Sequence, residues 1–341
     1  MNVIRRLYNA ITQRDEPRAG AFWMGPKRTA GVPVTHDNAM TYSAIWRAVN
    51  LISQSIAMMP WTVNQRDASR AESTTLWTHP AYNLLDLTPN DEIDALTFRQ
   101  TMLGWALTWG NGYAEIDRDR ASRPGQLWQI EPTRVNPDRT ANGRLVYEVS
   151  NGSAGNTVLE PKNMLHLKGM GYNGLSGHSV IAHAAQSIGL AKATEKFGSN
   201  FFSNGAHSNV IIQHPEQISD KALGHLTESL QKKYGGDNSH TPMVIEEGMT
   251  ATTISIPPDD AQFLETRKFQ IAEVARWYGI PLHKLHEMDK TSFNNIDQPN
   301  IEFFTDALLI WVRRLEMEAN IKLVSPAMRG RVYTKLNVNA L

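Results

Sequence analysis

The segment 258–298 constrains the fold more than any other part of the chain, because it predicts a long helix, a sharp stop and a polar loop in succession. Apolar residues recur at helical spacing up to Tyr278, after an aspartate that can cap the helix. Gly279 can leave a helix and Pro281 cannot continue one. A second helical stripe begins near Ile301, so the sequence predicts a movable polar loop between two long helices. That stripe consists of Phe304, Leu308, Trp311, Leu315 and Ala319.

The composition excludes several classes of protein. The 341 residues suffice for about two to three structural units, and 34 Lys and Arg balance 34 Asp and Glu. A protein that grips DNA usually carries a basic excess, because phosphate neutralisation dominates that affinity. Cysteine is absent and the N-terminus has no signal-peptide core, which favours a cytosolic chain without disulfides. No apolar run reaches the roughly 20 residues that a membrane helix needs.

The first half of the chain predicts a mixed α+β unit. An apolar face that begins at Ile45 predicts a helix over about 41–59, and Pro60 ends it. A second helix is expected at about 96–109. Asn142-Gly143 is a hairpin signal between alternating runs that predict strands. The expected strands are 61–65, 113–118, 126–130, 144–149 and 164–168.

The second half predicts a stalk. Residues 180–204 form one expected helix, roughly 38 Å long at 1.5 Å per residue. Its many alanines either allow close helix packing or reflect helix propensity alone. Between it and the helix at 259–278, the sequence predicts a β-α-β-β unit with strands near 210–213, 243–246 and 252–256. An insert between two long helices of similar length implies an antiparallel stalk with a small domain at its tip.

The search for catalytic chemistry finds no candidate site. Two histidines and a glutamate within 283–287 would need further ligands from elsewhere to hold a metal, and a solvated helix end is the simpler interpretation. Asp117, Asp119 and Asp138 could suggest two-metal chemistry, but turns separate them and arginines flank them. No G-x-x-x-x-G-K-[ST] phosphate loop occurs. We therefore expect no catalytic residue, no metal and no cofactor.

Several ordered motifs resemble those of the portal proteins of tailed bacteriophages, in particular the lambda-like long-tailed phages and prophages. The most specific motifs are FFSNGA at 201–206, RKFQIAEVARWYGIPLHKL at 267–285 and NNIDQ at 294–298. The resemblance runs through most of the chain. Further matching stretches are 44–61, 79–90, 96–119, 163–191 and 196–212.

The resemblance implies an α+β portal fold. Each subunit of such a portal has an α/β wing, an antiparallel two-helix stem, a small β-α-β-β clip between the stem helices, and a tunnel loop that projects into the channel. Relatives commonly continue into a helical crown, so we expect the crown to be missing or reduced here. The implied parts are a flexible N-terminal arm at 1–30, the wing at 31–178, the stem helices at 180–204 and 259–278, the clip at 206–257, the tunnel loop at 279–298, a long helix toward the crown at 299–323 and a C-terminal segment at 324–341.

The function that the resemblance implies is not enzymatic. Portals of this group form rings, usually twelve-fold, at one vertex of the capsid. They conduct double-stranded DNA, without sequence specificity, during packaging and ejection. Their expected partners are the terminase large subunit, which would supply ATP hydrolysis, the major capsid or scaffold protein and a head–tail adaptor. The chain is expected in the virion, and in the host cytoplasm during assembly, with no membrane contact.

Two sets of residues follow from the resemblance. The polar tunnel loop is expected to face DNA without tight binding, consistent with the neutral chain; its candidates are His286, Asp289, Lys290, Thr291, Ser292, Asn294 and Asn295. The clip is expected to contact the packaging motor and then the adaptors; its candidates are Gln231, Lys232, Lys233 and Tyr234. A loop without DNA contact remains open. So do a metal-dependent nuclease that acts on phage DNA and the portal of a domesticated gene-transfer particle.

Overall fold

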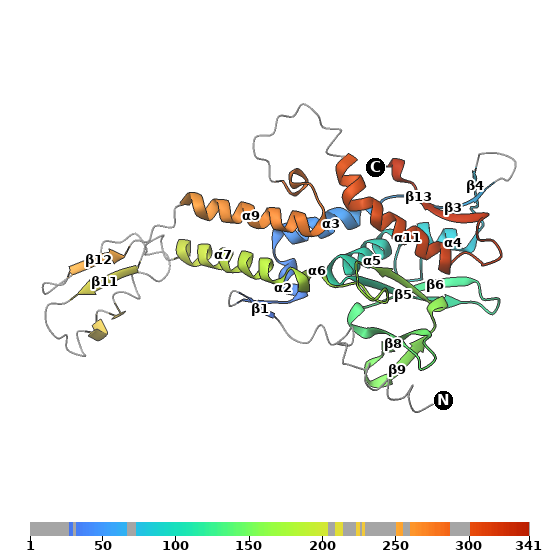
Figure 1. Cartoon of the computed structure of the whole chain (residues 1–341), viewed down its shortest axis with the longest axis horizontal. Coiled ribbons are helices and arrows are strands. Elements are labelled where there is room, and N and C mark those ends of the chain that lie inside the picture. Colours follow the sequence, from blue (N-terminus) through green and yellow to red (C-terminus); the bar gives the residue numbers. More distant parts are fainter. Residues whose placement is uncertain are drawn as a thin grey trace, which may run out of the picture.

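The computed structural model is elongated, with a compact body at one end and two long helices that project from it (Figure 1). The structure describes residues 27–29, 32–66, 73–203, 209–213, 223–225, 227–228, 250–254, 260–286 and 301–340. Within these residues, no helix is both long enough and apolar enough to cross a membrane.

Two helices and a three-stranded sheet form the centre of the body (Figure 1). Helix α3 (Ser43–Ala57) packs against α5 (Ala95–Trp109), which in turn packs against the antiparallel sheet β10-β5-β6. The strands are β5 (Asn111–Arg118), β6 (Pro124–Ile130) and β10 (Met164–Lys168). The predicted apolar face of α3 is buried through Ile45, Ile52 and Ile56. The predicted helices and strands of this centre are confirmed.

Two further antiparallel sheets flank this centre. The first consists of β3 (Trp61–Arg66), β4 (Ser73–Thr75) and β13 (Val332–Leu336). The second consists of β7 (Val135–Arg139), β8 (Leu145–Ser150) and β9 (Asn156–Leu159). The hairpin predicted at Asn142-Gly143 is confirmed, since Gly143 has φ +79° and its N–H donates to the Thr140 carbonyl at 2.7 Å. The sequence analysis did not predict β4, β7, β9 or β13. Strand β13 pairs with β3 from the opposite end of the chain, which no local pattern reveals.

Short elements complete the body. A capping box between Thr35 and Asn38 starts α2, and Pro80 at the first helical position starts α4. Helix α4 continues directly into the π-helical segment η2. The elements are β1 (Lys27–Thr29), β2 (Val32–Val34), α2 (His36–Met40), α4 (Pro80–Tyr82), η2 (Asn83–Leu87), η3 (Pro132–Arg134), η4 (Gly152–Ala154), η5 (Pro161–Asn163) and η9 (Val338–Ala340).

The two projecting helices, α7 (Ala185–Ser203) and α9 (Asp260–Tyr278), run antiparallel and side by side (Figure 1). Each has 19 residues and is therefore about 28 Å long. The helix predicted over 180–204 is interrupted at Ala184, so that α6 (Val180–His183) precedes α7. The small residues of this segment favour close packing over propensity alone, because those nearest the body are buried. They are Ala184, Ala185 and Ala191.

At the far end of these helices, β11 (Asn209–Gln213) and β12 (Thr250–Ile254) form a two-stranded antiparallel sheet (Figure 1). Both strands were predicted within two residues of these positions. Residues 223–225 and 227–228 are helical, within the helix expected between the strands. The strand expected at 243–246 lies outside the described residues.

The last long helix is not regular along its length. It begins with the π-helical segment η8 (Phe303–Leu308) and continues as α11 (Leu309–Lys322). A π-turn holds one residue more than an α-turn, which shifts the buried face along the sequence. Leu308, Leu315 and Ala319 of the predicted stripe are buried. Phe304 and Trp311 are only partly buried, and Phe303 and Val312 are buried in their place.

Candidate functional site

The first feature of the candidate site is the end of α9. Gly279 adopts a left-handed conformation with φ +65°, and the Ile280 N–H donates to the Ala275 carbonyl at 3.0 Å. This is the six-to-one hydrogen bond of a Schellman motif, in which a left-handed residue ends the helix. Ile280 is buried against the body. The predicted exit from the helix at Gly279 is confirmed.

A short 3₁₀ helix, η7 (Leu282–Leu285), follows this exit. Leu285 is buried, and Arg47 of α3 donates from Nε to the Lys284 carbonyl at 3.4 Å. His286 then caps η7 in a left-handed conformation with φ +62°, and its N–H donates to the His283 carbonyl at 3.2 Å. A non-glycine residue in this conformation is uncommon, which marks His286 as a sharp change of chain direction.

The chain returns to the body close to where it left. The Lys284 ammonium lies 5.4 Å from the centre of the Phe303 ring. Burial and Lys284 lower the pKa of His283, and the Glu302 carboxylate from the returning chain opposes them. Both η7 and η8 contact α3. The two ends of the segment 287–300 are therefore held at one place on the body, by the same helix.

The second feature is the base of the two projecting helices, where His36 and Ser179 meet. The His36 ring stacks on Trp109 with 3.5 Å between ring centres, and its Nε2 lies 3.1 Å from Ser179 Oγ. Ser179 Oγ donates to the Thr108 carbonyl at 2.8 Å and accepts from the Ala182 N–H at 3.0 Å, which caps α6. Burial lowers the pKa of His36 to about 4, so the ring is neutral at pH 7. One buried hydroxyl thus joins α2, α5 and α6.

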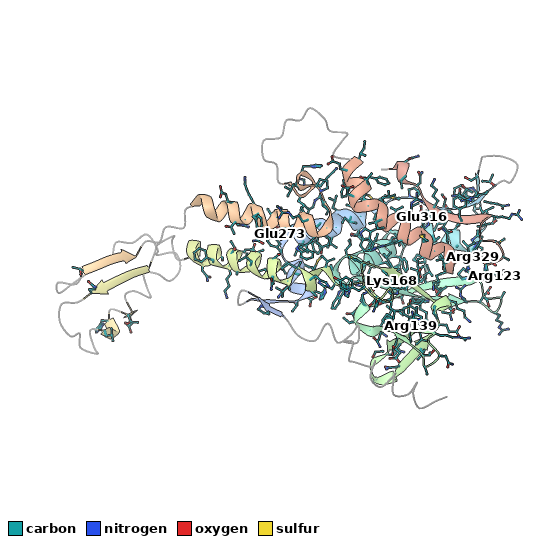
Figure 2. The ribbon with its side chains drawn as sticks, viewed as in Figure 1. Arg123, Arg139, Lys168, Glu273, Glu316 and Arg329 are labelled. Atoms are coloured by element: carbon teal, nitrogen blue, oxygen red, sulfur yellow. The ribbon has the colours of Figure 1, made fainter. Side chains whose placement is uncertain are left out.

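The surface charge of the projecting helices is nearly balanced. Helix α9 carries three acidic and three basic residues, and α7 carries one acidic and two basic residues. Glu273 of α9 lies between the two helices, where it accepts a hydrogen bond from Ser187 Oγ at 3.4 Å (Figure 2). The helix pair therefore presents no strongly basic surface to a polyanion.

Most residues of the two predicted sets lie outside the described residues. His286 is placed, exposed, at the start of the loop. Asp289, Lys290, Thr291, Ser292, Asn294 and Asn295 are not described, and neither are Gln231, Lys232, Lys233 and Tyr234. The sequence analysis missed Arg47, Ser179 and His36, because their contacts lie far away in the sequence and no local spacing marks them.

The acidic residues that were considered for a metal site are distributed over different elements. Asp117 lies on β5 and Asp138 on β7, in separate sheets. Asp119 forms an ion pair with Arg123 at 2.8 Å, and hydrogen bonds from Arg123 hold the pKa of Asp119 below its usual range. Among the described residues, no group of three His, Asp or Glu lies close enough to hold a metal ion.

Comparison with known proteins decides the family. The family model for phage portal protein matches residues 43–341. The chain belongs to the phage portal protein family. Two relatives of this portal-family chain span most of its length. The portal protein of Enterobacteria phage HK97 is 29% identical over 311 residues, covering 90% of this chain and 73% of the relative. The probable portal protein of Streptomyces phage phiC31 is 33% identical over 337 residues, covering 93% and 71%.

Solved structures of two similar proteins have the same fold. An HK97-family phage portal protein from Corynebacterium diphtheriae superposes with a TM-score of 0.68 at 16% identity, covering 90% of this chain and 96% of that one. A chain from the neck of a native gene transfer agent particle, computed with C12 symmetry, superposes with a TM-score of 0.63 at 18% identity, covering 93% and 86%. The predicted α+β portal fold is confirmed, and with it the resemblance that the motifs indicated.

Proposed function

We propose that this chain is the subunit of a portal ring, at one vertex of a phage capsid, through which double-stranded DNA passes during packaging and ejection. The observation that supports this most is the pair α7 and α9, which extends from the body of a portal-family fold as a long, nearly neutral helical unit. Arranged around an axis, such pairs form the wall of a channel. A wall without a strong positive field lets a polyanion slide, because few counterions are exchanged as it moves.

The ring is proposed to be twelve-fold, which is the symmetry used for the similar neck structure. Native mass spectrometry and electron microscopy along the ring axis test this directly. Particles with a central channel and about twelve subunits are the expected result. A chain that stays monomeric at every concentration would contradict the proposal, and metal-dependent cleavage of DNA by that monomer would favour a nuclease instead.

The segment 279–298 is proposed as the tunnel loop, with the polar residues from His286 to Asn295 near DNA. Its support is the closed base: η7 and η8 hold both ends on α3, so that the loop leaves from and returns to one fixed point. Because both ends of the loop are fixed close together, the loop can reach only a limited set of positions. Deletion of 288–295 should preserve ring formation and reduce the retention of packaged DNA in filled heads. Unchanged packaging and unchanged retention would refute a role for the loop at the DNA.

The unit between β11 and β12 is proposed as the clip, which contacts the terminase large subunit first and a head–tail adaptor later. Its support is position, because these strands lie at the far end of α7 and α9 (Figure 1). Alanine substitution of Gln231, Lys232, Lys233 and Tyr234 together should leave the ring intact and weaken its binding to terminase. In this proposal the chain itself has no catalytic role, no cofactor and no membrane contact. Its body contacts the major capsid or scaffold protein, and assembly takes place in the host cytoplasm before the ring enters the particle.

A gene-transfer particle is the second candidate context. The neck of such a particle has the same fold, and the mechanics of the ring would be identical. Sequencing the DNA from purified particles distinguishes the two contexts, since a phage would carry its own genome and a gene-transfer particle would carry fragments of the host chromosome.

A further inference from the structure

One face of α11 is exposed although it is largely apolar. Ile310, Met317 and Ile321 follow each other at helical spacing, and Met317 is 63% exposed. Arg314 lies on the same face, half-buried, with its guanidinium 4.9 Å from the centre of the Trp311 ring. An exposed apolar stripe on a helix of the body is typical of an interaction surface.

The loop after β10 extends this surface. Met170 and Tyr172 are both exposed, Tyr172 by 81%. Lys168, which lies beside α11 (Figure 2), lines a cavity of about 330 Å³ between the loop and α11. Arg314 lines the same cavity. The α11 face is therefore defined here by its apolar rim and its two cations: Lys168, Met170, Tyr172, Ile310, Arg314, Met317 and Ile321.

Specific hydrogen bonds hold α11 at the β10 edge of the central sheet. The backbone N–H of His166 in β10 donates to Glu318 Oε1 of α11 at 3.1 Å, and His166 itself is fully buried. Burial raises the pKa of Glu318, whereas Lys322, 3.8 Å away, lowers it. Glu318 is thus engaged within the subunit. Lys168, whose Nζ also donates to the Gly174 carbonyl at 3.2 Å, and Arg314 are the cations of the α11 face.

A second exposed surface lies at the opposite edge of the same sheet. Asn90 donates from Nδ2 to the Leu127 carbonyl at 2.8 Å, and the Leu127 N–H donates to the Pro89 carbonyl at 2.8 Å, which fixes the loop after η2 on the outer edge of β6. We call residues 87–96 the acidic loop, because they carry exposed apolar and acidic side chains. Within the part of the chain that the structure describes, none of its carboxylates forms an ion pair. The exposed side chains are Leu87, Asp91, Glu92, Asp94 and Leu96.

The two surfaces are complementary in chemistry and opposite in position. One offers apolar residues with two cations at the β10 edge, and the other offers apolar residues with carboxylates at the β6 edge. We propose that the α11 face of one subunit binds the acidic loop of a second copy of this chain. A contact between two different faces leaves a free α11 face at one end of a growing chain of subunits and a free acidic loop at the other, which is the heterologous geometry that closes into a ring. This inference rests on the proposed ring.

A charge-reversal experiment tests the contact. One variant combines Lys168→Glu with Arg314→Glu, a second combines Asp91→Lys with Glu92→Lys, and a third carries all four changes. Arg139→Glu with Arg144→Glu, at the exposed β7–β8 hairpin, is the matched control. Each variant is compared with the unmodified chain by native mass spectrometry and sedimentation over a concentration series, with circular dichroism as a measure of folding.

Each two-residue reversal should raise the concentration needed for ring formation by roughly tenfold or more, because like charges then face each other across the contact. The four-residue variant should recover most of the assembly, and the control should assemble normally. If a reversal unfolds the chain, the milder pair Lys168→Gln with Arg314→Gln should still weaken assembly. Normal rings from either folded reversal, or no recovery in a folded four-residue variant, would overturn the contact while leaving the ring itself intact. A monomeric unmodified chain would contradict both.

Discussion

Substitution of Ser179 by alanine should destabilise the base of the projecting helices by an amount that the structure allows us to estimate. Ser179 is fully buried, and its hydroxyl caps α6 through the Ala182 N–H. Loss of an N-cap costs about 1 kcal/mol. The hydroxyl is also a donor to the Thr108 carbonyl, which lies in the last turn of α5, where carbonyls have no partner within the helix. Loss of this hydrogen bond costs about 0.5–1.5 kcal/mol, because the His36 ring also hydrogen-bonds to the Thr108 backbone and remains beside it.

The two contributions together predict that Ser179→Ala lowers the free energy of unfolding by about 1.5–2.5 kcal/mol. Urea unfolding followed by circular dichroism, at one fixed protein concentration because assembly also stabilises the fold, measures this. Ser187→Ala is the control, since its hydroxyl makes a single 3.4 Å hydrogen bond to Glu273 and should cost less than about 0.5 kcal/mol. A loss below about 1 kcal/mol for Ser179→Ala, or one equal to the control, would refute the reasoning.

Three further predictions follow from single positions. Gly177→Ala should lower the free energy of unfolding, measured by thermal unfolding, by about 3 kcal/mol or more, because its Cβ would lie 2.1 Å from the Gly110 carbonyl oxygen. Gly104→Ala is the control: its Cβ has open space, and it should stabilise α5 by up to about 1 kcal/mol. Equal effects of the two substitutions would contradict this. Tyr278→Phe should leave the stability unchanged or raise it, because the buried hydroxyl has no hydrogen-bond partner among the described residues; a clear loss of stability would be unexpected. His36 is protonated near pH 6.5 when unfolded and near pH 4 when folded, so the free energy of unfolding should fall as the pH drops between these values, and His36→Gln should reduce that slope.

The sequence predicted the elements whose order depends on nearby residues. Helices α3, α5 and α9 have continuous apolar faces and clear ends, and Gly279 marks the end of α9 by its left-handed conformation. Strand β13 could not be predicted, because its pairing with β3 depends on residues from the opposite end of the chain. The π-turn of η8 was also missed, since its residues are ordinary helix formers and only tertiary packing selects the wider turn.

The candidate site was predictable in position more than in mechanism. The polar composition after Pro281 indicated a loop, and the motifs around it indicated the portal family. How the loop is supported depends on Arg47, which contacts the Lys284 carbonyl from a distant part of the sequence, and on Phe303, which contacts Lys284 from the other side of the loop. Spacing rules describe one helix at a time and therefore do not reveal such supports.

Helix α3 connects these observations, because it contacts α9, η7, η8 and α5. The base of the loop and the inner end of α9 therefore rest on one helix whose own apolar face is buried in the core. If DNA pulls on the loop as we propose, α3 and the body behind it take up the force, and the helix pair can stay in place. The weakest of these links is the single hydrogen bond from Arg47 to the Lys284 carbonyl, at 3.4 Å and only partly buried. Arg47→Ala should therefore reduce DNA retention without preventing ring formation, and a variant that retains DNA normally would show that the buried side chains of η7 and η8 suffice to hold the loop.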